Sequence, residues 1–159
     1  MKRILVALMI ISPLSYADLE FKDLGSGWRA MTQQLDPFDT SKVQIIQVRK
    51  GIFVLTCINL NWQAENDMYF DGYSFAADIK YIIDDNSPVG KGGRYSTYIG
   101  GSDMITDKRY FSFKINEADS TALKKGRTLK VAGNYSSSGW QTKTLELEGF
   151  ESVYNQMCD

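Results

Sequence analysis

Apolar and polar residues alternate with a period of two over Phe75–Ile83, and this pattern predicts a β-strand with one buried face. The pair Asp71-Gly72 precedes this stretch and lies between two aromatic-rich runs, an arrangement that favours a type I′ hairpin turn. A helix would place Asp78 and Lys80 in its apolar stripe, so a helix is disfavoured. We therefore predict that Met68–Asp85 forms a hairpin whose second strand is central to a β-rich domain.

The rest of the chain repeats this pattern of short strands separated by segments rich in glycine, proline and other turn-forming residues. The predicted strands are Trp28–Leu35 as an edge strand, Val43–Arg49 and Ile52–Leu60 joined at Lys50-Gly51, Tyr95–Ile99, Arg109–Ile115, Arg127–Tyr135 and Trp140–Leu147. Loops are expected over 36–41, 86–93, 100–103 and 136–139. Residues 18–27 are expected to form a short, loosely docked N-terminal segment, with a helix as one option.

Two short helices are predicted near the C-terminus. Asn116–Lys125 has a capping residue in Asn116 or Asp119, a basic last turn and a glycine after it. After Gly149, apolar residues recur at helical spacing and lead to Cys158; they are Phe150, Val153, Tyr154 and Met157. The predicted fold is therefore mainly β: a single antiparallel β-sandwich or barrel-like domain with one or two short helices.

The first 17 residues have the features of a signal peptide. Lys2 and Arg3 form a basic start, Ile4–Ile11 is apolar, and Ser15–Ala17 offers small residues where a signal peptidase reads them. A buried N-terminal strand is the alternative reading. We expect cleavage after Ala17, which leaves residues 18–159 as one domain in the periplasm or outside the cell.

Composition and charge narrow the classes of partner. The chain of 159 residues suits one domain, and its 43% hydrophobic content is ordinary for a globular protein. Loss of Lys2 and Arg3 with the leader changes the formal net charge from −1 to −3, which gives no basic footprint for nucleic acid. The apolar run of the leader is too short to span a bilayer, so we expect no integral membrane protein after cleavage.

The chain has two cysteines, Cys57 and Cys158. An even count in an oxidising compartment suggests one disulfide, which would close a loop of about 100 residues. Two free buried thiols are the alternative.

Catalysis has little support in the sequence, and we expect neither an enzyme nor a cofactor. The chain contains no histidine, which is the commonest general base and a frequent metal ligand, so no metal site is expected. The pair Asp84-Asp85 could act as a general acid, but a position between a strand and Asn86-Ser87-Pro88 is more typical of turn residues.

A recognition surface is predicted between Gly92 and Arg109. Tyr95 and Tyr98 lie there among serine, threonine and glycine, a mixture typical of adaptable binding surfaces, and Asp103 and Arg109 add charge. The alternative is a glycine-bounded edge strand without a partner.

Several segments together resemble the periplasmic, type VI secretion-associated family often called VasI-like. They are Trp28, Leu35–Ser41, Leu55-Thr56-Cys57, Ile79–Asp85, and Leu145–Phe150 followed by Cys158. The segment Leu35–Ser41 departs from the Ser-Pro-Leu-Asp-Asp-Ser pattern of that family, and residues 88–135 do not match the family closely. The resemblance implies an exported β domain with a Cys–Cys bridge, a module that can also serve phage-encoded or defence proteins.

The expected function is that of an exported, non-enzymatic binding or accessory protein that contacts a protein partner in the cell envelope. A secretion-apparatus accessory and a protective protein, for immunity or prophage superinfection exclusion, are both compatible with it. The alternative is a carbohydrate- or small-ligand-binding module, with Trp62, Trp140, Tyr95 and Tyr98 as stacking residues.

Overall fold

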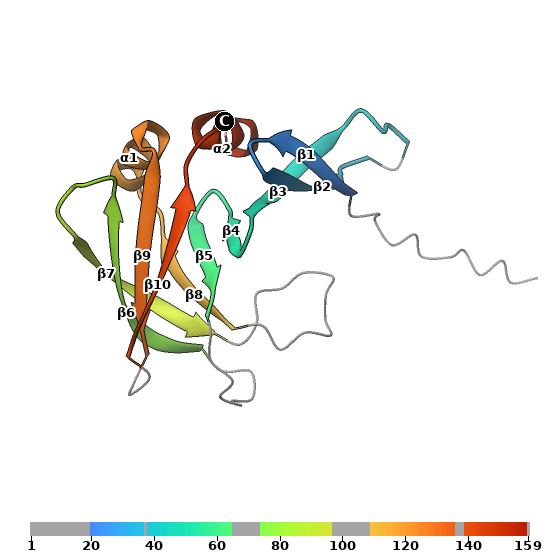
Figure 1. The fold of residues 1–159 in the computed structure, drawn as a ribbon. Helices are drawn as coiled ribbons and strands as arrows, with labels where there is room; N and C mark the ends of the chain where they lie inside the picture. The colour runs from blue at the N-terminus through green and yellow to red at the C-terminus, as the bar shows by residue number, and fades with distance from the viewer. Residues whose placement is uncertain (1–19, 37, 65–73, 97–108, 136–138, 159) are drawn as a thin grey trace, which may run out of the picture.

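A computed structural model describes residues 20–36, 38–64, 74–96, 109–135 and 139–158 of the chain. Within these ranges it contains ten β-strands and two α-helices (Figure 1). The strands are β1 (Glu20–Gly25), β2 (Trp28–Gln34), β3 (Val43–Lys50), β4 (Phe53–Leu55), β5 (Asn59–Gln63), β6 (Ser74–Ile83), β7 (Val89–Ser96), β8 (Tyr110–Lys114), β9 (Thr128–Asn134) and β10 (Trp140–Glu146). The helices are α1 (Glu117–Lys125) and α2 (Phe150–Cys158).

All ten strands belong to one antiparallel sheet, in the order β1-β2-β3-β4-β5-β8-β7-β6-β9-β10. The sheet curls, and both helices lie at the same end of it (Figure 1). Among the described strands β1 and β10 pair on one side only, so the sheet is not closed into a barrel. The prediction of a mainly β, antiparallel domain with two short helices is confirmed.

Strand β6 has the burial pattern that its alternation predicts. Its inner-face residues from Ala77 to Ile83 are buried, whereas Asp78 and Lys80 on the other face are exposed. It pairs with β7 on one side and β9 on the other, so it is an inner strand as expected. The predicted turn at Asp71-Gly72 and the first strand of that hairpin lie outside the described residues.

Aromatic side chains fill the concave inner face of the sheet. Trp62 stacks on Phe111 with ring centroids 5.4 Å apart, and Tyr81 stacks on Phe113 at 5.5 Å. Gly133 on β9 makes room for this layer, because a Cβ atom there would lie 2.5 Å from the Phe111 ring. Many of the described aromatic residues therefore help to build the core.

The two helices form where the sequence predicts them. Asn116 caps α1 and accepts a hydrogen bond from the Asp119 backbone N–H, while the Asp119 carboxylate accepts one from the Asn116 backbone N–H, which makes a capping box. The buried side of α2 faces the body through Phe150, Val153 and Met157.

Three local predictions are wrong. Residues 20–25, expected as a loosely docked segment, form β1 and pair with β2, so β2 is not an edge strand. The expected strand Ile52–Leu60 is two strands, because the chain turns at Thr56–Ile58 between β4 and β5. The expected loop 86–93 continues into β7 from Val89, despite its glycines.

Candidate functional site

Two residues of the predicted recognition surface, Tyr95 and Arg109, are buried. Tyr95 is only 5% exposed, and its ring stacks on that of Tyr135 with centroids 4.9 Å apart. Arg109 is 7% exposed. Burial also raises the pKa of the Tyr95 hydroxyl above its ordinary value. Tyr95 is therefore a core residue, and the prediction that it and Arg109 face a partner is corrected; Tyr98 and Asp103 lie outside the described residues.

The two tryptophans proposed as stacking residues of a carbohydrate site differ in exposure. Trp62 is fully buried against Phe111 and cannot meet a ligand. Trp140 on β10 is 45% exposed, and the Lys80 ammonium lies 4.7 Å from the centre of its ring. Of these two tryptophans, only Trp140 has a surface that a sugar can reach.

Asp84 is a turn residue that joins two parts of the chain. Its backbone is left-handed, with φ of 53°, and its carboxylate accepts hydrogen bonds from the backbone N–H groups of Arg127 and Thr128 at 2.9 and 2.8 Å. These bonds, that from Thr128 first, lower the pKa of the Asp84 carboxyl. The structure thus assigns Asp84 a clear local role at the start of β9.

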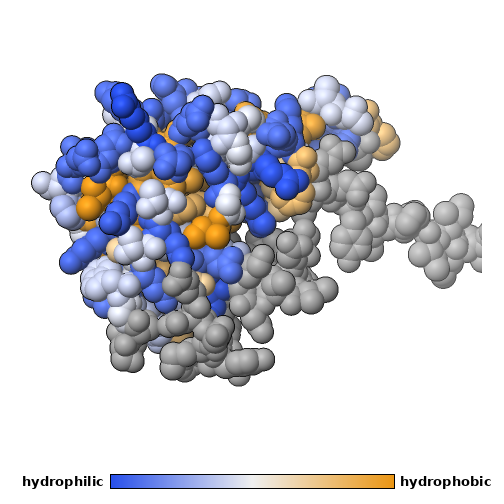
Figure 2. Space-filling view, viewed as in Figure 1, coloured by the Kyte–Doolittle hydropathy of each residue, from blue (hydrophilic) through white to orange (hydrophobic). Residues whose placement is uncertain are grey.

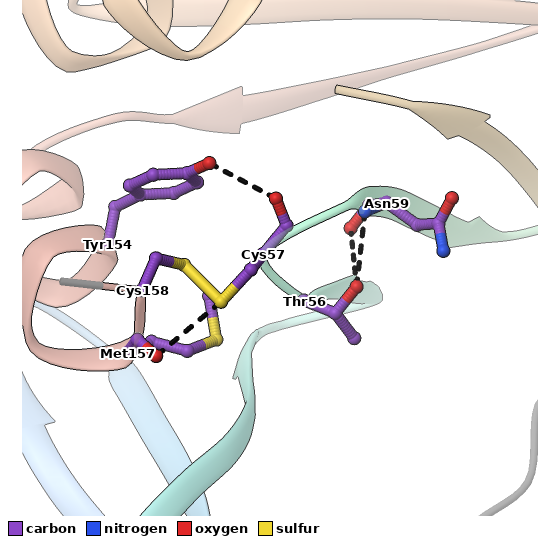
Figure 3. The surroundings of a disulfide bond; sticks show 6 residues. All are labelled: Thr56, Cys57, Asn59, Tyr154, Met157 and Cys158. Atoms are coloured by element: carbon purple, nitrogen blue, oxygen red, sulfur yellow. Dashed lines mark hydrogen bonds between the residues drawn. A yellow bond between two sulfur atoms is a disulfide. The ribbon is translucent and has the colours of Figure 1, made fainter. Parts of the chain in front are cut away.

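Cys57 and Cys158 form a disulfide, as the sequence predicts. Cys57 lies in the turn between β4 and β5, and Cys158 is the last residue of α2 (Figure 3). The Tyr154 hydroxyl donates a hydrogen bond of 3.1 Å to the backbone oxygen of Cys57 beside the bridge. The bond and its neighbours attach the C-terminal helix to the sheet.

A buried group of charges lies where α1 meets the inner face of the sheet. The Asp119 carboxylate, 6% exposed, forms an ion pair with Lys91 and accepts a hydrogen bond of 2.5 Å from the Tyr81 hydroxyl. Burial raises the pKa of Tyr81 and lowers that of Lys91. These contacts join α1 to strands β6 and β7 and close this end of the core.

Three exposed apolar residues, among them the most exposed of the described large apolar residues, gather at the end of a projecting arm. We call β1, β2, β3 and the loop between β2 and β3 the arm; it extends away from the rest of the sheet (Figure 1). Leu35, Phe38 and Val43 at its end, here named the tip patch, are 60%, 97% and 49% exposed. Figure 2 shows hydrophobic surface at this end of the molecule, and further hydrophobic patches among the hydrophilic residues of the body.

The loop that carries the tip patch has a defined hydrogen-bonded shape. The Leu35 backbone N–H donates to the Lys42 carbonyl at 2.8 Å, and the Phe38 N–H donates to the Asp36 carboxylate at 2.9 Å. The Lys42 ammonium lies 3.4 and 3.5 Å from the carboxylates of Asp36 and Asp39. Two hydrogen bonds from Ser41 lower the pKa of the Asp39 carboxyl. The sequence predicts a turn over this segment, and the signal for an exposed contact residue is the aromatic Phe38 inside that turn.

The base of the arm is fixed to the body by Trp28. Its ring is fully buried, packs edge-to-face on Phe150 at 5.9 Å, and donates a hydrogen bond of 2.8 Å from Nε1 to the carbonyl of Glu148. The Lys50 ammonium lies 5.3 Å from the same ring. The arm therefore has a rigid attachment, and the tip patch is held in a set position.

Among the described residues, no group of three or more His, Cys, Asp and Glu side chains could hold a metal ion. No helix in the described part of the chain has the length and apolarity to cross a membrane.

The chain matches no family model and no curated protein. Among solved structures, it is similar to invasion associated protein B from Bartonella henselae, with 13% sequence identity and a TM-score of 0.44. The match covers 87% of this chain and 95% of that one.

Proposed function

We propose that the protein is an exported, non-enzymatic binding protein, and that the tip patch of its arm docks into an apolar pocket of a protein partner in the bacterial cell envelope. The observation that carries the proposal is Phe38, whose side chain is 97% exposed on a hydrogen-bonded loop.

The energetics favour docking of this residue. Burial of a phenylalanine side chain is worth about 1.5–3 kcal/mol, and the free protein gains almost none of this at Phe38. A partner pocket would recover it, which corresponds to roughly 10- to 150-fold in affinity. Leu35 and Val43 would add apolar contact beside it. A central aromatic residue with smaller neighbours is a common composition of an interface hot spot.

The rigidity of the arm supports the same function. Binding costs less when the contacting segment is already ordered, because fewer rotamers and backbone angles are fixed on association. The Asp36 and Asp39 turns order the loop, and Trp28 anchors the arm below it. The tip patch is thus preorganised for contact.

Charge favours a protein pocket over a lipid surface. Asp36 and Asp39 lie on either side of Phe38 in sequence, with Lys42 as their partner. Two carboxylates beside an apolar residue would be repelled by anionic lipid headgroups. They would suit an apolar pocket that has a basic rim.

Location in the envelope rests on the expected leader and is compatible with the disulfide between Cys57 and Cys158. Within that compartment, a secretion apparatus, a phage protein or a toxin is the proposed class of partner. The segment Leu35–Ser41, which contributes to the VasI-like resemblance, carries Leu35 and Phe38 of the tip patch. A non-enzymatic role fits a chain with no histidine and with both cysteines in a bridge.

Site-specific photocrosslinking in the native host tests the proposal. A photoreactive phenylalanine analogue placed at position 38 should crosslink the full-length protein to one envelope protein. The same analogue at Ile58 is the matched control, because Ile58 is also an exposed apolar residue, 63% accessible, in the turn between β4 and β5. Phe38→Ser should weaken binding to the crosslinked partner by at least tenfold without loss of thermal stability.

Three outcomes would contradict the proposal. Crosslinks to lipid alone would replace the protein partner with a membrane, and crosslinked homodimers would replace it with a second copy of the chain. Equal crosslinking from positions 38 and 58 would show that the tip patch has no special role.

A further inference from the structure

A hollow of about 570 Å³ lies over β5, β7 and β8, and β4 separates these strands from the arm strands in the sheet order. Its polar lining comes from Asn59, Lys91, Arg94, Ser112 and Lys114, with Gly92 between them. A volume of this size suits a small ligand or a few units of a longer one.

The register of the sheet places four of these polar side chains on the outer face. Asn59 pairs with Lys114 between β5 and β8, and Arg94 pairs with Ser112 between β7 and β8. Directly paired residues project from the same face of an antiparallel sheet. Phe111 and Phe113 alternate with Ser112 and Lys114 and are buried, and Phe113 together with Gly93 and Lys91 completes the lining of the hollow. The outer face here is therefore polar and directed away from the core.

Gly92 keeps the floor of the hollow open. It lies two residues from Arg94 on the same strand face, and a Cβ atom at Gly92 would meet no atom within 4 Å. A glycine inside a strand costs about 0.5–1 kcal/mol relative to alanine. Its neighbour Gly93 has a packing reason, since a Cβ there would lie 2.6 Å from the Ser112 carbonyl oxygen. Packing gives no such reason for Gly92, whose effect is to leave space between charged side chains.

The hollow is positively charged. Among the described residues, Arg94 and Lys114 have no ion pair, and no carboxylate lines the hollow, whereas Lys91 is paired with Asp119. Asp78 pairs with Gly92 from the neighbouring strand β6, and Lys80 follows it on the same face. The charges of Asp78 and Lys80 cancel, and those of Arg94 and Lys114 leave the outer face net positive on a chain of formal net charge −1.

We propose that this hollow binds a saccharide that carries an oxyanion, either a carboxylate or a phosphate group. The Arg94 guanidinium suits a bidentate contact with the oxyanion, and Lys114 adds a second positive charge. The Asn59 amide and the Ser112 hydroxyl can bind sugar hydroxyl groups, because each both donates and accepts hydrogen bonds.

Two observations favour a saccharide over an acidic peptide. Beside Arg94 and Ser112 the strands β5, β8 and β7 pair with one another, so a peptide finds no free strand edge to pair with there. Register also aligns Gly92 with Asp78, Asn134 and the exposed Trp140 across four neighbouring strands. Three strand spacings amount to roughly 14 Å, the reach of a short oligosaccharide whose far end would stack on Trp140.

Titration of the full disulfide-bonded protein, followed by NMR of its backbone amides, tests the proposal. The probes are inorganic phosphate, a uronic acid trisaccharide, the matching neutral trisaccharide and a short oligoglutamate peptide. Saturable chemical-shift changes at Gly92, Arg94 and Ser112 are expected with phosphate or with the uronic acid trisaccharide. Comparison of these two titrations distinguishes recognition of a phosphate group from recognition of a carboxylate. Saturation by oligoglutamate with no response to either anionic saccharide or phosphate would overturn the saccharide assignment, and no saturation by any probe would overturn the site.

Matched variants locate the binding. Arg94→Gln and Lys114→Gln should each weaken binding about tenfold. Gly92→Val should abolish binding by filling the hollow, whereas Gly90→Val should bind normally. Gly90 is the matched control, because it is on the same face of β7 with equally open space around it but does not line the hollow. Equal binding by both valine variants would refute the inference. Phe38→Ser should leave this binding unchanged, so the result is independent of the proposed function of the arm.

Discussion

The ion pair between Lys91 and Asp119 allows a quantitative test of how the core is closed. Asp119 is the third residue of α1, and its carboxylate receives Lys91, the Tyr81 hydroxyl and the Asn116 backbone N–H. The side chains of Asp119 and Lys91 are 6% and 19% exposed. Asp119→Asn removes the negative charge while keeping the size of the side chain, and it leaves the ammonium group without its partner.

The expected loss is about 3 kcal/mol in the free energy of unfolding. Removal of one partner from a buried ion pair typically costs about 3–5 kcal/mol, and the residual exposure of Lys91 puts this case at the lower end. Loss of a negative charge in the first turn of α1 contributes about 0.3–1 kcal/mol of that total. Lys91→Met should cost less, about 1–2 kcal/mol, because its apolar stem still packs near Phe113 and Asp119 keeps two hydrogen bonds.

Urea denaturation of the oxidised wild type, the two single variants and the double variant measures the coupling directly. The double variant should be more stable than the sum of the single losses predicts, by at least about 1 kcal/mol, since it contains neither unpaired charge. Asp85→Asn is the control, an exposed aspartate expected to change stability by less than about 0.5 kcal/mol. Strict additivity of the two losses, or an Asp119→Asn variant as stable as the control, would refute the role assigned to this pair.

Three further predictions follow from single contacts. Gly133→Ala should lower the unfolding free energy by about 1–3 kcal/mol in urea melts, because its Cβ would press on the Phe111 ring; an unchanged midpoint would contradict the packing. The pKa of Asp84 is lowered in the folded state, so its stabilisation is present above the ordinary pKa of about 3.8 and is lost as the pH falls through the lower folded value. When the pH is lowered from 5, Asp84→Asn should therefore lose less unfolding free energy than the wild type. Parallel profiles of unfolding free energy against pH would contradict this prediction. Reduction of the bridge between Cys57 and Cys158 should cost about 2–5 kcal/mol and increase hydrogen exchange first in α2; uniform exchange along the chain would argue otherwise.

Regular alternation and local capping are the features that sequence patterns predict well. Strand β6 and helix α1 agree with prediction because their signals are short-range: a period of two in one, and a capping residue with a basic last turn in the other. The pairing of Cys57 with Cys158 was also accessible, since two cysteines in an oxidising compartment allow only one intramolecular bond.

Strand β7 shows where such patterns fail. Its glycines suggest a loop, yet Gly93 is needed in the sheet because Ile79 and the Ser112 carbonyl occupy the space of a side chain. That requirement comes from neighbouring strands and has no local signal. The same error placed Tyr95 on the surface, since its serine and glycine neighbours suggest solvent exposure while Tyr135 and Phe111 enclose it.

The candidate sites escaped prediction for a related reason. Arg94, Ser112 and Lys114 are ordinary outward-facing residues in their own strands, and only the pairing of β7 with β8 and β8 with β5 brings them around one hollow. The tip patch is not predicted for another reason. The turn residues Asp36 and Asp39 indicate a loop, but they do not indicate that the loop extends away from the rest of the sheet.

Helix α2 connects the arm to the rest of the fold. Its first residue, Phe150, packs against Trp28 of the arm, and its last residue, Cys158, is bonded to the turn between β4 and β5. The carbonyl that receives the Trp28 hydrogen bond belongs to Glu148, just before the helix. Release of α2 would therefore remove the support beneath Trp28 while leaving the loop of the tip patch intact. Because a preorganised arm binds at lower entropic cost, the docking proposed for the tip patch would depend on the disulfide between Cys57 and Cys158.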